Sequence, residues 1–133
     1  MIRRKLRVLI ARFGDGYDNA MLKLATACSE AGFEVVYTDI QDPRAIVASA
    51  IQEAVDHIGI TTLPGATVEH FAALFELLKK EGVSHIRVTA GGFFPPESVA
   101  RIKAMGLLDF YPEGSIYNKI GQWSKDFGES TEP

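Results

Sequence analysis

Hydrophobic and polar positions along this chain follow two different spacings. Five short runs are rich in apolar, mostly β-branched residues, which is typical of strands buried in a parallel sheet. In the longer segments between these runs, apolar residues recur every three or four positions and so share one helix face. The pattern predicts strands at residues 6–11, 33–38, 57–61, 85–90 and 107–111, and helices at residues 19–31, 43–54, 68–81, 97–105 and 115–127.

Residues with known preferences mark several helix ends. Asp42 can cap the second helix, with Pro43 in its first turn, and Thr67 can cap the third. Gly32 and Gly82 stand where the first and third helices would stop. The apolar helix faces are expected to consist of Met21, Leu24, Ala25 and Cys28 in the first helix, Ile46, Val47, Ala50 and Ile51 in the second, and Phe71, Leu74, Phe75 and Leu78 in the third.

Strands and helices alternate along the chain with short connections. This alternation predicts an α/β fold in which helices cover both faces of a parallel sheet through right-handed crossovers. We therefore expect a single flavodoxin-like, doubly wound domain with five parallel strands over residues 1–128, followed by a flexible tail at residues 129–133. Such folds bind ligands beyond the carboxyl ends of the strands, so the loops after the first, third and fourth strands should carry the function.

Composition and charge narrow the possible classes of protein. The 133 residues are 47% hydrophobic, which is enough to form a core and too much for a disordered chain. The net charge is -3, and the one basic cluster, at residues 3–7, fits a solvated lead-in to the first strand better than a nucleic-acid contact. The single cysteine, Cys28, is expected to be a buried thiol. Without a membrane-spanning run or a signal peptide, we expect a cytoplasmic location.

Three of the predicted loops are glycine-rich or carry small polar residues, at positions 15–20, 61–66 and 91–96. Each loop alone fits a tight turn, but three at one sheet edge favour a slot in which backbone approaches a bulky ligand. A phosphoacceptor receiver domain is excluded, because the third strand ends in Thr61 instead of Asp and the fifth ends without a Lys. The chain also lacks a flavodoxin phosphate loop and the glycine motifs of nucleotide-binding folds.

The combination of loops resembles the B12-binding domain of methylmalonyl-CoA mutase and of the small subunits of related acyl-CoA mutases. That family carries D-x-H-x-x-G after the first strand, S-x-L after the third and G-G after the fourth. The matching segments are residues 15–20, 61–63 and 91–92, and the similarity covers nearly the whole chain. The resemblance implies that cobalamin, as adenosylcobalamin, is bound by Asp15, Gly16, Tyr17, Asp18, Ala20, Thr61, Thr62, Leu63, Gly91, Gly92 and Phe93.

The resemblance also implies a role for each loop. In the family, the dimethylbenzimidazole tail leaves cobalt and enters the domain beside the sheet. The glycines of the fourth loop let backbone approach this tail, and a hydroxyl of the third loop contacts it. The histidine of the first loop binds cobalt, while the aspartate two residues earlier fixes the tautomer of that histidine.

The sequence departs from the family at the cobalt ligand. Tyr17 stands at the histidine position, Ala20 stands at the final glycine position, and the loop before Asp15 is one residue shorter. A phenol has a pKa of about 10 and is a far weaker ligand than imidazole at neutral pH. A neighbouring carboxylate would further oppose its ionisation.

The three histidines do not replace the missing ligand in the predicted fold. His57 and His85 begin strands at the edge opposite the loops, and His70 lies in the helix after the third strand. Each is expected to be an ordinary surface or strand-end residue away from the first loop. The sequence therefore predicts no protein ligand to the metal.

Three interpretations remain open after this comparison. The first is that the chain binds cobalamin without histidine ligation. The second is that it is a degenerate module, which keeps the fold and acts as a structural or regulatory subunit. The third is that another bulky ligand occupies the same slot.

The sequence shows no catalytic centre of its own. It contains no Ser-His-Asp set, no metal-ligand spacing and no paired catalytic carboxylates. In the family the cofactor supplies radical chemistry, and a separate barrel binds the acyl-CoA. The resemblance thus implies the small subunit of an isomerase, with a larger acyl-CoA-binding barrel subunit as partner, a homo-oligomer as a further option, and neither nucleic acid nor membrane. An apolar rim for the partner is expected from Phe93, Phe94, Pro95 and Pro96.

Overall fold

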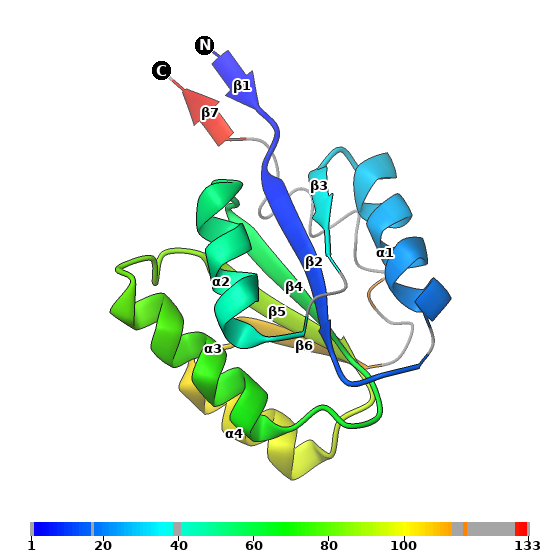
Figure 1. Ribbon diagram of the computed structural model, residues 1–133. Coiled ribbons are helices and arrows are strands. Elements are labelled where there is room, and N and C mark those ends of the chain that lie inside the picture. Colours follow the sequence, from blue (N-terminus) through cyan, green and yellow to red (C-terminus); the bar gives the residue numbers. More distant parts are fainter. Residues whose placement is uncertain (1, 17, 39–40, 113–115, 117–129, 133) are drawn as a thin grey trace.

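The computed structural model describes residues 2–16, 18–38, 41–112, 116 and 130–132. Its centre is an all-parallel, five-stranded sheet in the order β3-β2-β4-β5-β6 (Figure 1). The order reverses between β2 and β4, which is the switch point where doubly wound folds bind ligands. The strands are β2 (Arg7–Phe13), β3 (Glu34–Tyr37), β4 (His57–Thr62), β5 (Arg87–Gly92) and β6 (Asp109–Pro112).

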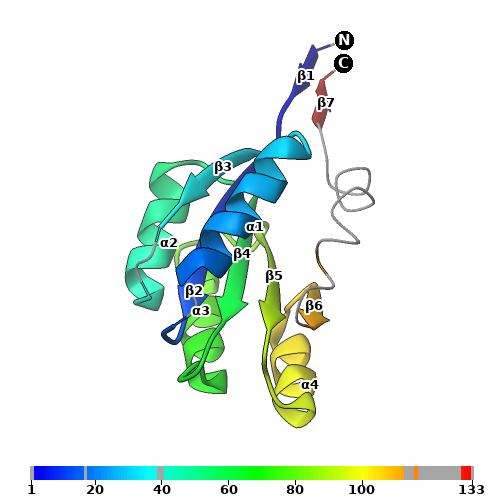
Figure 2. The same ribbon diagram turned by 90° about the vertical axis from the view of Figure 1, so that its right-hand side faces the viewer.

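Helices cover both faces of this sheet. One face is packed by α2, α3 and α4, and the other by α1 (Figure 2). The predicted caps are confirmed, since the side chains of Asp42 and Thr67 accept hydrogen bonds from the first turns of α2 and α3. The doubly wound, flavodoxin-like prediction is therefore confirmed. The helices in the described residues are α1 (Asp18–Glu30), α2 (Pro43–Gln52), α3 (Val68–Lys80) and α4 (Pro96–Met105).

The sequence pattern located these elements closely. The five predicted strands and the first four predicted helices all form, and their ends differ from the predicted ends by at most two residues. The fifth helix, predicted at residues 115–127, lies outside the described residues except for the helical Ile116. The periodicity of apolar residues therefore predicts whether a segment is a helix or a strand, whereas the backbone hydrogen bonds of the folded chain determine the residue at which each element ends.

A second, two-stranded sheet joins the ends of the chain. In it, β1 (Ile2–Arg4) pairs antiparallel with β7 (Ser130–Glu132), and Arg3 lies opposite Thr131. This pair lies beyond the amino ends of the main strands (Figure 1). The sequence pattern did not predict this pairing, and the flexibility expected for residues 129–133 stays a prediction.

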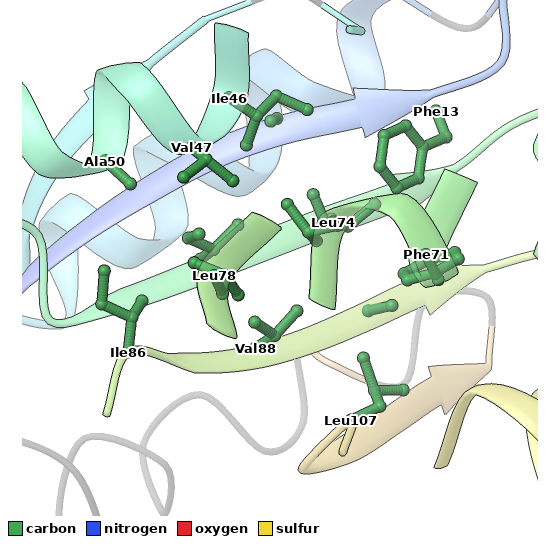
Figure 3. Packing of buried hydrophobic residues seen from close by; sticks show 14 of the residues in the cluster. Phe13, Ile46, Val47, Ala50, Phe71, Leu74, Leu78, Ile86, Val88 and Leu107 are labelled. Atoms are coloured by element: carbon green, nitrogen blue, oxygen red, sulfur yellow. The ribbon is translucent and has the colours of Figure 1, made fainter. Parts of the chain in front are cut away.

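The larger hydrophobic core lies between the sheet and the helices α2, α3 and α4 (Figure 3). Phe13 and Phe71 are fully buried in it, and their rings meet edge to face with centroids 5.0 Å apart. Burying one such apolar side chain contributes roughly 1.5–3 kcal/mol, so this core is the main source of stability. Its other members include Leu9, Ile46, Val47, Ala50, Ile58, Leu74, Leu78, Ile86, Val88 and Leu107.

One residue of the predicted apolar face of α2 is exposed, so the buried part of that face is narrower than the face predicted from the sequence. Ile46, Val47 and Ala50 are buried, whereas Ile51 is 42% exposed. Ile51 lies in the last turn of the ten-residue helix and borders a surface hollow between α2 and α3. Ile51, predicted on the apolar face of α2, therefore lies at the exposed margin of that face.

A smaller core lies between the sheet and α1. Met21 and Cys28 of the helix pack with Val8 and Ile10 of β2. Cys28 is 1% exposed, and burial raises the pKa of its thiol to about 12. The prediction of a buried thiol is confirmed, and the raised pKa leaves little of the nucleophilic thiolate at neutral pH.

Candidate functional site

The three loops predicted to carry the site meet at the carboxyl edge of the sheet. The backbone N–H of Leu63, after β4, donates to the carbonyl of Phe13 at 2.9 Å. The N–H of Asp15, after β2, donates to the carbonyl of Pro64 at 2.9 Å. The N–H of Phe93, after β5, lies 3.4 Å from the carbonyl of Thr62. These bonds join the loops after β2, β4 and β5 into one continuous surface, as the sequence predicted.

A fourth segment, which the sequence analysis did not single out, completes this edge. Gln41 precedes α2, and its Oε1 atom accepts the backbone N–H of Gly14 at 2.9 Å. Its Nε2 atom donates to Oδ1 of Asp15, also at 2.9 Å. The carboxylate of Asp15 therefore has an amide partner from another loop. No periodicity or motif marks Gln41 in the sequence, because its two contacts lie far away along the chain.

Two glycines at this edge are required by the protein itself. Gly14 has φ +94°, and an added β-carbon would lie 2.3 Å from the carbonyl oxygen of Leu63. Gly92 has φ +119°, and its added β-carbon would lie 2.5 Å from the carbonyl oxygen of Thr62. Both the positive φ angles and the close backbone contacts exclude a side chain at these positions. The presence of Gly92 therefore has a structural explanation that is independent of any ligand.

The α1-facing side of β4 carries small and polar residues. Side chains alternate between the two faces of a strand, and Ile58 and Ile60 belong to the core beneath α2 and α3. Gly59 and Thr61 therefore face the α1 side. An added β-carbon at Gly59 would lie 3.3 Å from Cδ1 of Ile10, a member of the core beneath α1, which confirms this direction.

The neighbouring strand β5 continues this surface. Strand pairing sets Gly59 beside Thr89 and Thr61 beside Gly91, and we call these four residues the α1-side strip. Central strands of a doubly wound sheet usually carry branched apolar side chains on both faces, because helices cover both. The α1-side strip instead combines two glycines with two hydroxyl groups. It reaches the carboxyl edge at Thr61 and Gly91, which are both half-buried.

The two threonines that end β4 have different roles. Thr62 is fully buried and donates its hydroxyl hydrogen bond to the carbonyl of Gly91 at 3.0 Å, which joins the ends of β4 and β5. Thr61 is half-buried and belongs to the α1-side strip. Leu63 is 5% exposed and closes the strand end. Of these three predicted site residues, Thr61 is therefore the one that is not buried and that lies on the α1-facing side of the sheet.

The two phenylalanines of the loop after β5 have different surroundings. Phe93 is 57% exposed, next to the exposed Pro95 and Pro96. Phe94 packs inward, with ring centroids 5.8 Å from Phe71 and 6.4 Å from Phe110. The apolar rim expected at this loop thus lacks Phe94, whose ring belongs to the core.

The first loop is only partly described. Asp15 and Gly16 are exposed at the carboxyl edge, and Gly16 has φ +97°. Asp18 and Ala20 belong to the first turn of α1. The position predicted to face cobalt, Tyr17, lies outside the described residues.

The histidine at the start of β4 is a strand-end residue, as expected, and its ring is buried. His57 is 1% exposed, and its Nε2 atom lies 2.9 Å from the hydroxyl of Thr89. The pKa of His57 is lowered to about 3, mainly by burial and also by the positive charge of Arg87, while the negative charge of Asp56 acts in the opposite direction. The ring is therefore neutral at physiological pH and serves as a hydrogen-bonding group beside the α1-side strip.

The histidine of α3 lies closer to the first loop than expected. The ring of His70 stacks on Phe13, the residue before Gly14, at a centroid distance of 4.8 Å. Its Nδ1 atom accepts the backbone N–H of Thr67 at 3.0 Å, as part of the cap of α3. In the neutral ring this acceptor role places the proton on Nε2, which leaves no free lone pair for a metal. His85 is exposed before β5, at the amino edge.

Neither a metal-binding cluster nor a membrane-spanning helix is present in the described part of the chain. No group of three or more His, Cys, Asp or Glu side chains in it has a geometry that could hold a metal ion. No helix in it is long and apolar enough to cross a membrane.

The fold and its carboxyl edge define a ligand-binding α/β domain of the doubly wound class. Residues 6–115 match the B12 binding domain family. The chain belongs to this family, and the predicted resemblance is confirmed.

Relatives in this family include whole subunits and parts of larger chains. The 2-hydroxyisobutanoyl-CoA mutase small subunit of Aquincola tertiaricarbonis is 37% identical over 126 residues, covering 90% of this chain and 93% of the relative. The methylmalonyl-CoA mutase large subunit of Streptomyces virginiae is 30% identical over 115 residues, but the match spans only 16% of that subunit. A cobalamin-binding protein from Desulfitobacterium hafniense shares the fold, with a TM-score of 0.75 over 92% of this chain and 59% of that chain at 17% identity.

Proposed function

We propose that this chain is the cobalamin-binding small subunit of a coenzyme-B12-dependent acyl-CoA mutase, and that it holds adenosylcobalamin without a histidine ligand to cobalt. Family membership and similarity to a mutase small subunit over nearly the full length of both chains support the cofactor and the subunit type. The observation that carries the proposal is the α1-side strip, which leads from the joined loops into the domain.

The α1-side strip has the chemistry that a benzimidazole nucleotide tail requires. Gly59 and Gly91 bring no side chains of their own to this surface, so a flat ring could approach the backbone once Cδ1 of Ile10 and the Tyr111 carbonyl, which lie next to the two glycines, move aside. The hydroxyls of Thr61 and Thr89 can bond to polar atoms of the nucleotide. Thr61 and Gly91 lie at the carboxyl end of the strip and would meet the tail first. Bound cobalamin would supply the cobalt–carbon bond for radical chemistry, while this chain would bind and orient it.

The absence of histidine ligation is supported by the surroundings of each histidine. His57 is buried against Thr89, on the strand end opposite the loops. The Nδ1 atom of His70 is engaged by the cap of α3, and His85 lies at the amino edge. Together with Tyr17 at the family's ligand position, these contacts favour a cobalt whose lower face is not bound by a protein imidazole.

The proposed partner is a larger barrel subunit that binds the acyl-CoA substrate. A corrin at the carboxyl edge would leave its upper face uncovered, and radical intermediates require exclusion from water. The exposed ring of Phe93 lies at this same edge and can contribute an apolar contact. A cytoplasmic location and self-association of the small subunit stay predictions.

The first test of this proposal is cofactor uptake. The purified protein is incubated with a several-fold excess of hydroxocobalamin or adenosylcobalamin and then separated from free ligand by gel filtration. We expect the corrinoid spectrum to co-elute with the protein. Absence of corrinoid from the protein peak at micromolar concentrations would exclude the cobalamin assignment and favour a degenerate subunit or a different ligand.

A further inference from the structure

The Gln41 side chain connects two loops at the carboxyl edge through both ends of its amide. Its carbonyl oxygen accepts the backbone N–H of Gly14 at 2.9 Å, and its amino group donates to the carboxylate of Asp15 at 2.9 Å. Gln41 is half-buried, whereas Asp15 is exposed. One side chain from the segment before α2 thus fixes both the backbone and the acidic side chain of the loop that enters α1.

The same loop is fixed from its other side by the segment after β4. The backbone N–H of Asp15 donates to the carbonyl of Pro64 at 2.9 Å. Gly14 packs so closely on the carbonyl of Leu63 that no side chain fits between them. Both backbone N–H groups of the Gly14–Asp15 unit therefore have partners, one of them on Gln41. The side-chain rotamer of Asp15 is then the remaining conformational freedom of this unit, and the hydrogen bond from Gln41 fixes that rotamer.

We propose that Gln41 is a positioning residue for cobalamin, which holds the Gly14–Asp15 loop in its binding conformation before the cofactor arrives. This inference rests on the proposed cobalamin-binding function. A loop that is already ordered loses less conformational entropy on binding, so fixing it strengthens affinity. The bond to the exposed Asp15 carboxylate contributes little to folding, because water competes for both partners. Disrupting it should therefore change cofactor affinity more than it changes the stability of the domain.

A swap of donor and acceptor tests this role directly. Gln41→Glu keeps an acceptor for Gly14 but sets two carboxylates against each other at Asp15. Asp15→Asn keeps an acceptor for Gln41, so we expect it to weaken cobalamin binding less than Gln41→Glu does. The double variant Gln41→Glu/Asp15→Asn restores one donor and one acceptor with their positions exchanged. Gln52→Glu introduces the same charge at an exposed site on α2 and serves as the matched control.

The dissociation constant for hydroxocobalamin is measured for all five proteins by calorimetry, with thermal melts in parallel. We expect Gln41→Glu to weaken binding about tenfold, equivalent to the loss of one charge-assisted contact, while the double variant recovers to within about twofold of Asp15→Asn. Gln52→Glu should bind like the wild type. If wild type binds and Gln41→Glu binds equally well, the positioning role is overturned and the proposed function survives. Equal weakness of the single and double variants also overturns it, whereas failure of the wild type to bind rejects the proposed function itself.

Discussion

The ring of His57 and the hydroxyl of Thr89 form a buried polar pair, with 2.9 Å between Nε2 and Oγ1. The two side chains lie on adjacent strands, 1% and 4% exposed, on the α1-facing side of the sheet. A buried hydroxyl and a buried imidazole each need a partner, because an unsatisfied polar group costs about 1–3 kcal/mol. The pair therefore places polar chemistry at the inner end of the α1-side strip.

The first prediction concerns the pH dependence of stability. The folded-state pKa of His57 is about 3, below its ordinary value of 6.5, so between these values the unfolded chain binds a proton that the folded chain does not. The free energy of unfolding should therefore fall as the pH falls below 6.5, with a slope of up to about 1.4 kcal/mol per pH unit from this residue. Urea denaturation at pH 7, 6 and 5 should show a smaller loss in His57→Gln than in wild type. His85→Gln, at an exposed position, is the control, and equal slopes in all three proteins would contradict the prediction.

The second prediction tests the α1-side strip by filling it. Gly59→Val adds a branched side chain on the α1 side, where the nearest atom is the flexible Cδ1 of Ile10. We expect it to abolish cobalamin co-elution while the domain stays folded. Ala90→Val is the matched control, because it overpacks the core on the other face and costs about 1–3 kcal/mol without touching the strip. Equal cobalamin binding by Gly59→Val and wild type would show that the tail lies elsewhere.

The third prediction concerns Gly92, where a side chain should lower the stability of the domain itself. A side chain at this position would fill the predicted tail slot on sequence grounds alone. In the structure, however, its φ is +119° and an added β-carbon would overlap the carbonyl oxygen of Thr62. Gly92→Leu should therefore lower the melting temperature by several degrees, corresponding to a loss of at least about 1–3 kcal/mol, even without cofactor. An unchanged melting temperature would contradict this structural role.

The fold could be predicted because its signals are local. Apolar runs, helical spacing and caps such as Asp42 and Thr67 lie within a few residues of the element that they specify. The burial of His57 had no such signal, because a polar residue at a strand start is usually solvated and its partner Thr89 lies 32 residues away. The pairing of β1 with β7 likewise joins opposite ends of the chain through short segments without strong alternation.

The candidate site could be predicted as a set of loops but not as a set of contacts. Glycine-rich turns at three strand ends indicated the carboxyl edge, and these loops are joined there. The Gln41 bridge depends on side-chain contacts across 26 and 27 residues, which no spacing rule reveals. The different roles of Thr61 and Thr62 follow from strand alternation, which fixes their faces only once the end of β4 is known.

The fourth prediction concerns the cobalt ligand. In the family that this chain resembles, an aspartate holds the cobalt-binding histidine, but here the Asp15 carboxylate is bonded to Gln41. Tyr17→His alone should therefore fail to give histidine-ligated cobalamin, and Tyr17→His/Gln41→Ala should do better because Asp15 is released. The measurement is cob(II)alamin EPR of protein labelled with nitrogen-15 histidine, at saturating cofactor. Isotope-dependent splitting in wild type would show that a histidine does bind cobalt and would contradict the proposed ligation. The same splitting in the single variant would show that the Gln41 bond does not restrict Asp15.

The last prediction concerns docking of the large subunit. Phe93 is 57% exposed beside the joined loops, so its ring is available to a partner that covers the carboxyl edge. Truncating a central aromatic contact typically costs more than 1 kcal/mol, so Phe93→Ser should weaken assembly about tenfold with little effect on the melting temperature. Phe94→Ser is unsuitable, because that ring packs in the core near Phe71 and its loss would lower stability directly. Leu108→Ser is the control, since Leu108 is 47% exposed just before β6, at the opposite edge. Pull-downs from the native host, with melts in parallel, should recover a mutase large subunit with wild type and Leu108→Ser but far less with Phe93→Ser. Equal recovery with all three proteins would place the interface elsewhere, and no recovery with wild type would count against a mutase assembly.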